Sequence, residues 1–398
     1  MQDERAHSTV SKPESLAGAH AWLGKQGATV LDEQIELARI ASPPFQEQER
    51  ATVIAAKLDS MGAKPKSDDV GNLLAWYPIG ADQTTSQPIV IAAHMDTVFG
   101  PDIPIEIRQE DERWVGPGIT DNARGLAVCL TVLRSLIHSN VDLRHPLLFA
   151  FTVGEEGPGD LRGVKHLFAA DSALRSAAAF IAVDGTGLRR IIHHALGSRR
   201  FRVTIRGAGG HSWTDWGRSN PANASGDFIR HLAELTLPKQ PRTTLTVARH
   251  GGGTSINAIP AESWVELDLR SEDAETLHVL ESSVREALHA SIAAEEARAD
   301  GALTVEVTII GERPAGRLST SHPLVQAAMQ ATRNIGCDPE YAVSSTDANV
   351  PLAAGVPAIA IGGGGRSANT HTQNEWFENT DGPSGALRLL HIISLIAG

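Results

Sequence analysis

Three short apolar runs constrain the fold of this chain more than any other feature of its sequence. Residues 88–93, 147–153 and 178–183 are almost continuously apolar, and none of these runs alternates with polar residues. Such runs are typical of parallel strands whose two faces are both covered by helices. Between the first two runs, after Asp121, leucines recur at the spacing of one helical face. We therefore predict an α/β domain in which helices flank a mixed sheet.

A segment that begins near Gly197 has a different pattern. The alternating strand FRVTIRG is followed by a helix near 221–236, the strands TTLTVAR and SWVELDLR, a helix over 273–296, and the strand LTVEVTII. This β-α-β-β-α-β order is that of the ferredoxin-like split unit. We therefore predict a second, α+β domain.

The second domain interrupts the first one along the chain. The length of 398 residues exceeds the ~250–300 residues at which single cores stop growing, so two domains are expected. From Pro323 the α/β pattern resumes with a helix and the strand VPAIAI. We predict a discontinuous first domain over 1–197 and 312–398, with an inserted domain over 198–311.

The composition excludes several classes of partner. Lys and Arg number 35 against 47 Asp and Glu, so the net charge is −12, and there is no long basic run. This argues against binding to nucleic acid or to anionic membranes. The two cysteines, Cys129 and Cys337, provide no disulfide framework. Without an apolar leader or a membrane-length apolar stretch, we expect a cytoplasmic enzyme.

Acidic and imidazole side chains recur where apolar runs break into turns. The series is His94, Asp96, Asp121, Glu155, Glu156, Asp184 and His371. Such groups at the ends of buried strands are costly unless something satisfies them. Two histidines with three carboxylates suit zinc. Two divalent cations (+4) balance three carboxylates and one hydroxide (−4), whereas a single cation leaves the set negative.

Each residue of the series also has a structural alternative. Asp121 would suit a helix N-cap, Asp184 a turn, and His371 a surface loop. The adjacent pair Glu155-Glu156 is the sharper signal, because one acid can bind metal while its neighbour meets the metal-bound water. A solvated loop pair is its alternative. Together the residues favour metal-assisted hydrolysis of an amide.

The motifs that carry these residues resemble a known family. HMDTV, ITDNARG, GEEG, VDG and the late His resemble the aminoacylase/carboxypeptidase family of dinuclear zinc hydrolases over about residues 28–398. The family includes peptidase T, glutamate carboxypeptidase, carnosinase-like dipeptidases, acetylornithine deacetylase and succinyl-diaminopimelate desuccinylase. The resemblance implies a discontinuous zinc-peptidase catalytic domain with an inserted lid and dimerisation domain.

The resemblance also implies which residues bind metal. Asp121 would bridge two zinc ions. His94 and Asp184 would complete one site, and Glu156 and His371 would complete the other. Co²⁺ or Mn²⁺ are alternatives to zinc.

The remaining acids receive other roles from the resemblance. Glu155 would be the general base that moves protons, and Asp96 would orient His94. A cis peptide would join Asp121 to Asn122.

Residues of the inserted domain would complete the site. His211, in GGHSW, would reach the active site of a second chain and stabilise the developing oxyanion. Asn257 and Arg270 would hold the substrate carboxylate. Two features of the first domain are less defined: the segment IGGGG at 361–365 would line the substrate pocket, and the role of Asp347 stays open.

We therefore predict a dinuclear zinc exopeptidase that acts as a homodimer through its lid. It would cleave small peptides as a dipeptidase, tripeptidase or carboxypeptidase, through a hydroxide that bridges the metals. A deacylase of N-acyl amino acids would use the same metals and base, and it stays the alternative. A metal-free binding protein on the same scaffold is a more remote alternative from another class.

Overall fold

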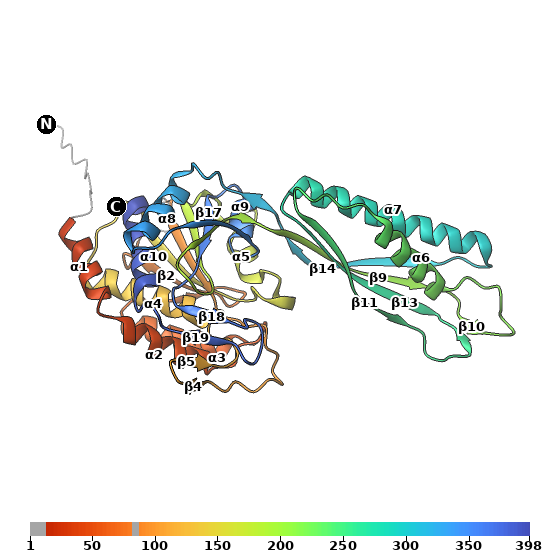
Figure 1. Ribbon diagram of the computed structural model, residues 1–398, viewed down its shortest axis with the longest axis horizontal. Helices are drawn as coiled ribbons and strands as arrows, with labels where there is room; N and C mark the ends of the chain where they lie inside the picture. The colour runs from red at the N-terminus through yellow and green to blue at the C-terminus, as the bar shows by residue number, and fades with distance from the viewer. Residues whose placement is uncertain (1–12, 82–86) are drawn as a thin grey trace. The chain divides into compact units, whose positions relative to one another are not determined.

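The structure, a computed structural model, describes residues 13–81 and 87–398, which form two compact units (Figure 1). Unit 1 takes its residues from the chain up to Ala195 and from Arg317–Gly398, and unit 2 is Leu196–Gly316. Unit 1 is a mixed sheet flanked by helices and unit 2 is an α+β unit. The predicted fold class is confirmed.

A mixed sheet forms the centre of unit 1, with the strand order β1-β2-β6-β3-β7-β17-β8-β15 and β16 beside β8. Its strands are β1 (Lys66–Ser67), β2 (Leu73–Tyr77), β3 (Ile89–His94), β6 (Leu147–Thr152), β7 (Ala179–Val183), β8 (Arg190–Ala195), β15 (Gly316–Arg317), β16 (Glu340–Ser344) and β17 (Ala358–Ile361). The three apolar runs of the sequence are β3, β6 and β7. All three are parallel neighbours with every residue buried.

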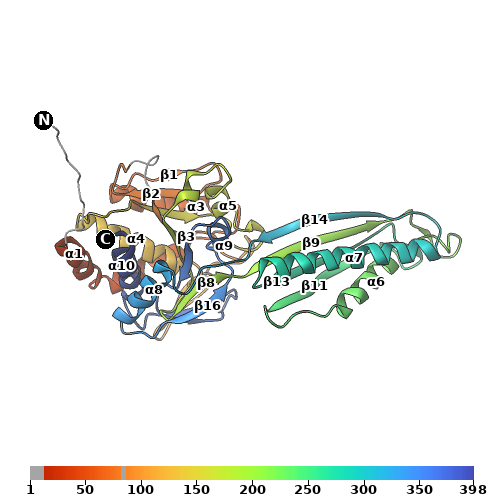
Figure 2. The ribbon, with the colours of Figure 1, turned by 90° about the horizontal axis from the view of Figure 1, so that it is seen from above.

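Helices cover both faces of this sheet. They are α1 (Pro13–Leu23), α2 (Gly27–Ala38), α3 (Gln48–Ser60), α4 (Ala123–His138), α5 (Arg162–Leu167), α8 (Pro323–Asn334), α9 (Asn349–Ala353) and α10 (Ser384–Ala397). Figure 2 shows α4, α8 and α10 on one side of β3, and α5 and α9 on the other.

Strand β3 contributes to two separate apolar cores. Ile89 and Ile91 join the larger core with the residues of α4 and α10, whereas Val90 and Ala92 join a smaller core on the opposite face. A strand buried on both faces has no position for polar residues, which explains its unbroken apolar sequence. The first polar side chain of β3, His94, therefore appears only where the strand ends.

Unit 1 also contains a small antiparallel sheet, separate from the large one. It has the order β18-β19-β5-β4 and consists of β4 (Arg108–Glu110), β5 (Arg113–Val115), β18 (Arg366–Ala368) and β19 (Trp376–Glu378). Trp376 pairs with Val115, so the segment before β19 lies beside the segment after β5. This pairing joins parts of the chain that are far apart in sequence.

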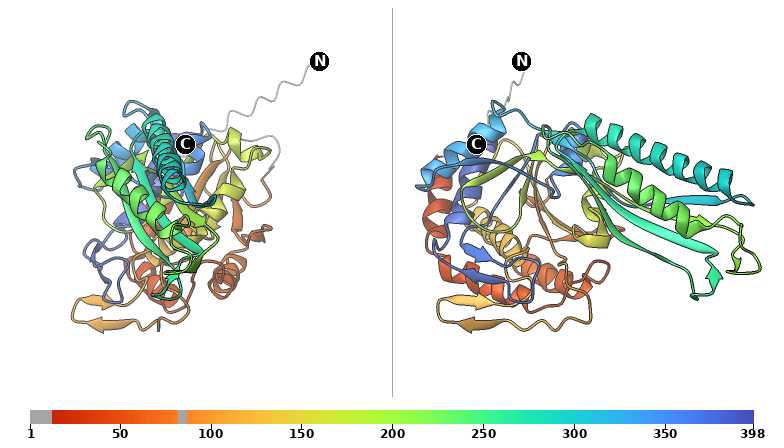
Figure 3. Two further views of the ribbon diagram at one scale, coloured as in Figure 1. Left: turned by 90° about the vertical axis from the view of Figure 1, so that its right-hand side faces the viewer. Right: turned by 45° about the vertical axis from the view of Figure 1, so that its right-hand side comes forward.

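Unit 2 has the predicted β-α-β-β-α-β order. Its elements are β9 (Gly197–Arg206), α6 (Pro221–Glu234), β11 (Thr243–Gly252), β13 (Glu262–Ser271), α7 (Ala274–Arg298) and β14 (Thr304–Arg313). Figure 3 shows both helices on one face of the four-stranded sheet, whose order is β11-β13-β9-β14. Phe201, Val203 and Leu267 fill the core beneath the helices.

The strands of unit 2 present ion pairs on alternate positions. Arg202 pairs with Glu266, and Arg200 with Asp268, across β9 and β13. The alternation explains why these strands, unlike β3, β6 and β7, have mixed polar and apolar sequences. In the described part of the chain, no helix combines the length and apolar character needed to cross a membrane.

One packing contact within unit 1 brings two titratable imidazole rings together. The imidazole rings of His20 on α1 and His391 on α10 lie 4.2 Å apart between centroids. Burial, followed by the nearby charge of His391, lowers the pKa of His20 from 6.5 to about 4. The unfolded chain therefore binds more protons at this position than the folded chain between these two values, so acidification disfavours folding.

We predict that His20→Gln removes part of this pH dependence. The free energy of unfolding of the unmodified protein, minus that of the variant, should decrease as the pH falls from about 7 to about 5. Urea denaturation of both proteins at each pH measures this difference. A difference that does not change with pH would show that protonation of His20 is not linked to folding.

Candidate metal centre

The ends of three parallel strands bring most of the predicted ligands together. His94 is the last residue of β3, Glu155 and Glu156 follow β6, and Asp184 follows β7. Because the strands are parallel neighbours, their carboxyl ends meet at one edge of the sheet. Asp121 joins them from the loop before α4.

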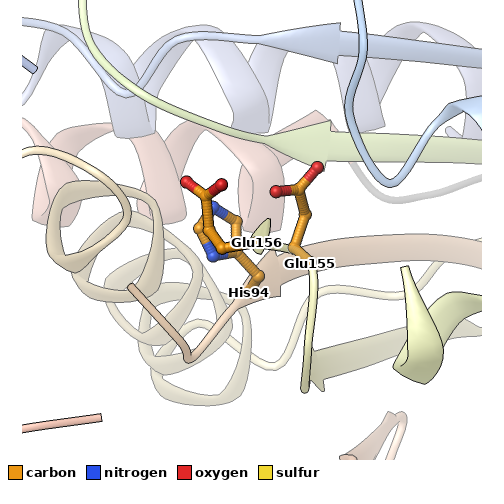
Figure 4. A group of neighbouring side chains, drawn as sticks. All are labelled: His94, Glu155 and Glu156. Atoms are coloured by element: carbon orange, nitrogen blue, oxygen red, sulfur yellow. The ribbon is translucent and has the colours of Figure 1, made fainter. Parts of the chain in front are cut away.

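The ligating atoms form three overlapping groups in which all atoms lie within 4.8 Å of one another. The groups are His94 with Asp121 and Asp184, Asp121 with Glu156 and His371, and His94 with Glu155 and Glu156. The first two groups share Asp121. Figure 4 shows the third, in which both glutamate carboxylates extend alongside the imidazole of His94.

The two carboxylate oxygens of Asp121 face different imidazoles. Oδ1 lies 3.0 Å from Nε2 of His94, and Oδ2 lies 3.1 Å from Nε2 of His371. His94 Nε2 is also 3.7 Å from Asp184 Oδ1, and His371 Nε2 is 3.0 Å from Glu156 Oε1. Asp121 is therefore the central group between two sets of donors.

These residues fit a metal ion. Oδ1 of Asp121 is buried and has no hydrogen-bond partner among the described residues, since its contact with His94 lacks hydrogen-bond geometry. A buried carboxylate oxygen in this state is costly, and a cation would satisfy it. Imidazole nitrogen and carboxylate oxygen are both zinc ligands.

The close contacts between acids and imidazoles shift their pKa values. Burial opposes the charged form of His94, but contacts with Asp121, Asp184 and Asp96 raise its pKa well above the ordinary value. Hydrogen bonds with Asp121 and Glu156 raise the pKa of His371 to about 10. Burial opposes ionisation of Asp121, but His371 and His94 hold the pKa of Asp121 well below its ordinary range. The set attracts positive charge, and binding a metal here would release protons.

Asp96 contacts three residues of the centre. Nδ1 of His94 lies 3.0 Å from the main-chain oxygen of Asp96 and 3.7 Å from its carboxylate. Donation from Nδ1 leaves Nε2 free to face Asp121. The carboxylate of Asp96 accepts from the backbone amides of Glu155, at 2.9 Å, and Glu156, at 2.8 Å. Asp96 thus holds three residues of the centre in register.

A buried arginine stabilises the same strand end. Arg50 donates to the main-chain oxygens of Met95 and Ile40, at 2.7 and 2.6 Å. Burial lowers the pKa of Arg50 to about 10, and the charge of Asp96 opposes that shift. The guanidinium offsets part of the negative charge beside the centre.

The start of α4 fixes the position of Asp121. A cis peptide joins Asp121 to Asn122, as predicted. Asn122, not Asp121, is the N-cap: its side chain accepts from Gly125 N and donates to Val183 O at 2.8 Å. The N-cap alternative for Asp121 is therefore wrong. A Cβ at Gly125 would lie 2.2 Å from Val183 O, so only glycine allows this approach of α4 to β7.

The segment IGGGG at 361–365 supports Asp184. The amide of Asp184 donates to Ile361 O at 2.9 Å, and Gly363 N donates to Gly185 O at 3.0 Å. A Cβ on Gly362 would lie 2.1 Å from the main-chain oxygen of Thr186. Close approach of two backbones is the reason for glycine at this position.

Two buried acids that received no role from the sequence lie near the centre. Asp347 is 3% exposed and accepts from Thr152 Oγ1 at 2.5 Å. Burial raises the pKa of Asp347 to about 6, although the charge of His94 opposes the shift. Glu375, four residues after His371, binds the loop that carries Asp121. Its proximity to a predicted ligand was the one sequence signal available.

The predicted substrate residues lie in unit 2. His211 is on β10 (Gly210–His211), which pairs with β12 (Ala258–Ile259), and Ser212 N donates to Asn257 O. His211 and Asn257 are therefore neighbours. Arg270 is at the far end of β13 and pairs with Asp268 at 2.8 Å. Within one unit 2, the structure brings His211 and Asn257 together but not Arg270.

Comparison with known proteins gives a consistent set of relatives. A family model described as peptidase family M20/M25/M40 matches residues 90–394. The cytosol non-specific dipeptidase of Escherichia coli is 25% identical over 286 residues, which cover 66% of this chain and 57% of the relative. The succinyl-diaminopimelate desuccinylase of Nitrosomonas europaea is 26% identical over 349 residues, which cover 83% and 88%.

Solved structures are similar over most of the chain. The aminopeptidase PepT of Bacillus cereus has a TM-score of 0.73 at 25% identity and covers 93% of this chain and 98% of its own. A tripeptidase of Staphylococcus aureus has a TM-score of 0.76 at 22% identity with the same coverage, which shows the fold. Among sequence relatives, the chain spans only about half the length of the dipeptidase (57%) and of a probable carboxypeptidase of Aspergillus terreus (54%).

We predict that Asp96→Asn weakens zinc binding without unfolding the chain. An amide has one acceptor oxygen, so Glu155 N or Glu156 N loses its partner. Groups that hold metal ligands typically contribute about 10- to 100-fold in affinity, and we expect the zinc Kd to rise by that factor. Competition with a chromophoric chelator measures it.

Asp273→Asn is the matched control for this substitution. The Asp273 carboxylate accepts from Thr276 N at 2.8 Å at the start of α7, in unit 2. The Asp273→Asn variant should have the zinc affinity of the unmodified protein. An unchanged zinc Kd in Asp96→Asn would show that Asp96 does not support the centre.

Proposed function

The chain belongs to peptidase family M20/M25/M40, and from this premise we propose that it is a zinc-dependent exopeptidase that hydrolyses small peptides. The proposal rests on Asp121, which belongs to two groups of possible metal ligands. Its two oxygens lie 3.0 and 3.1 Å from imidazoles that come from the two separate chain segments of unit 1. A carboxylate between two such donor sets is suited to bridge two cations.

We propose two zinc ions per chain, with Co²⁺ or Mn²⁺ as alternatives. His94, Asp121 and Asp184 would hold one ion, and Asp121, Glu156 and His371 the other. When bound, two zinc ions polarise a substrate carbonyl and lower the pKa of a water molecule.

Glu155 is the proposed general base. Its side chain is buried beside His94 and Glu156, and its backbone amide is fixed by Asp96. Glu155 belongs to neither of the two groups that share Asp121, so in this proposal it transfers protons and the members of those two groups bind the metal. It would take a proton from the attacking water and deliver it to the nitrogen of the leaving amine.

The names of the relatives support two substrate classes. The dipeptidase, the tripeptidase and the aminopeptidase support a di- or tripeptide substrate. The desuccinylase, whose match covers 83% of this chain, supports the alternative of an N-acyl amino acid. Turnover of dipeptides, tripeptides and N-acyl amino acids by the zinc-loaded protein distinguishes them. The cytosol dipeptidase also supports a cytoplasmic location.

We propose that the active form is a homodimer. Asn257 precedes β12 and Arg270 is near the end of β13, so about eight strand residues, or roughly 26 Å, separate the two ends. One small substrate carboxylate cannot contact both residues of the same unit 2. Asn257 and Arg270 would therefore act on the sites of different chains, and we propose that Asn257, with its neighbour His211, acts on the site of the second chain.

The outer edge of β14 is the proposed contact between the two copies. It pairs with β9 on one side, and in the described part of the chain no strand pairs with the other. Val305, Ile309 and Ile310 are exposed along it by 38%, 49% and 44%. Antiparallel addition of a second β14 would cover these side chains and satisfy the backbone groups of the edge.

We predict that Glu155→Gln loses activity and keeps its metal. Removing a general base typically costs about 10²- to 10⁴-fold in rate. Steady-state hydrolysis of a dipeptide by the zinc-loaded variant measures the loss, and elemental analysis measures bound zinc. Glu286→Gln, an exposed position on α7, is the matched control. Lost zinc in Glu155→Gln would mean that Glu155 is a ligand, and full activity would mean that it is not the base.

We predict that two inactive variants restore activity to each other. In a mixed dimer of His211→Ala and Glu155→Gln chains, one site has an intact Glu155 from one chain and an intact His211 from the other. Random exchange should therefore restore about a quarter of the unmodified activity. Adding Ile310→Lys to both chains should prevent the recovery. No recovery after verified exchange would contradict action of His211 on the partner.

A further inference from the structure

Glu375 is fully buried although it carries a charge-bearing side chain next to an acidic centre. It lies between His371 and β19, and its exposure is 0%. No arginine, lysine or histidine contact to it is present among the described ion pairs. Burying a carboxylate without a cation is costly unless several donors surround it.

The donors that surround this carboxylate all come from the loop of Asp121. Oε1 accepts from Thr120 N at 2.7 Å and from Asp121 N at 3.2 Å, and it also contacts the hydroxyl of Thr120. Oε2 accepts from Gly118 N at 3.4 Å. The main-chain oxygen of Glu375 accepts from Gly116 N at 2.8 Å. A single residue thus binds the whole segment that leads to Asp121.

This contact connects two predicted ligands, Asp121 and His371, that lie 250 residues apart in the chain. The pairing of Trp376 with Val115 brings β19 beside β5, and Glu375 extends that connection up to Asp121. His371 lies on the same short loop as Glu375, and its Nε2 is 3.1 Å from Asp121 Oδ2. The distance between Asp121 and His371 therefore depends on the bonds that Glu375 makes.

The two proposed metal sites depend on this contact unequally. Asp121 belongs to both sites, but only the site with Glu156 and His371 also takes a ligand from the loop of Glu375, whereas His94 and Asp184 are held by the strand ends of β3 and β7. A change in the loop contact should therefore affect the first site more. A residue that only stabilised the fold would affect both sites alike.

We propose that Glu375 is a positioning residue that fixes Asp121 relative to His371 and thereby sets the affinity of the metal site formed by Asp121, Glu156 and His371. The inference rests on the proposed dinuclear function. Glu375 contacts no substrate and no reacting atom in this account. It acts through the backbone of the loop that carries Asp121.

Calorimetric titration of the chelator-stripped full chain with zinc tests the proposal. The unmodified protein should bind two zinc ions per chain. In Glu375→Gln, the amide group replaces one acceptor oxygen with a donor, so the Kd of one ion should rise about tenfold or more while the other changes less than about threefold. His371→Ala identifies the sites, because the phase that remains in it belongs to His94 and Asp184.

Two further variants control for general destabilisation. Asp381→Asn makes the same kind of change at a half-buried carboxylate that accepts from a backbone amide, that of Gly365, and should leave both zinc affinities unchanged. Thr120→Val removes only the hydroxyl donor to Glu375 and should weaken the same site as Glu375→Gln, to a smaller extent. If Glu375→Gln does not fold, the zinc titration of Thr120→Val tests the proposal in its place.

Three outcomes decide the matter. Selective weakening of the site that His371→Ala abolishes supports the proposal. Equal weakening of both ions, or no weakening in either Glu375→Gln or Thr120→Val, overturns it and leaves the proposed function standing. An unmodified chain that binds fewer than two ions overturns the proposed dinuclear function and this inference with it.

Discussion

The candidate site depends on one carboxylate whose two oxygens face opposite ways. Asp121 presents Oδ1 to His94 and Oδ2 to His371, at 3.0 and 3.1 Å. His94 ends a central strand and His371 lies on a loop between two short strands, so Asp121 contacts side chains from two distant parts of the unit 1 sequence. If Asp121 moves relative to His371, the set formed by Asp121, Glu156 and His371 loses its geometry. The surrounding hydrogen bonds restrain Asp121 against this movement.

Three separate supports hold Asp121 and its neighbours. Asn122 caps α4 and binds Val183, which places Asp121 beside the end of β7. Asp96 binds the amides of Glu155 and Glu156 and lies behind His94. Glu375 binds the loop that precedes Asp121. Asp96 and Glu375 accept from backbone amides, and Asn122 accepts from one backbone amide and donates to a backbone carbonyl. All these bonds lie in a buried environment, where they hold geometry closely.

Much of this arrangement could be predicted from local sequence. The unbroken apolar runs identified β3, β6 and β7, because a strand covered on both faces excludes polar residues until it ends. The acids and imidazole that follow these strands were therefore recognisable as a group at one edge. Alternating residues in β9 and β13 identified the second unit for the opposite reason, since one of their faces is not covered by helices.

The supports could not be predicted in the same way. Glu375 and Asp121 are 254 residues apart, and no local pattern indicates that one binds the amide of the other. Asp96 was expected to orient His94, but the use of its carboxylate on two backbone amides depends on how β6 ends beside β3. Gly362 likewise has a reason only in the tertiary structure, where Thr186 leaves no room for a side chain. Contacts of this kind follow from topology.

Anomalous diffraction from crystals of the zinc-loaded protein, recorded on both sides of the zinc absorption edge, tests the central role of Asp121 most directly. The account predicts two zinc peaks per chain, each about 2.0–2.2 Å from a different oxygen of Asp121. One peak should lie against His94 and Asp184, and the other against Glu156 and His371. A single peak, or two peaks of which only one contacts Asp121, would contradict it.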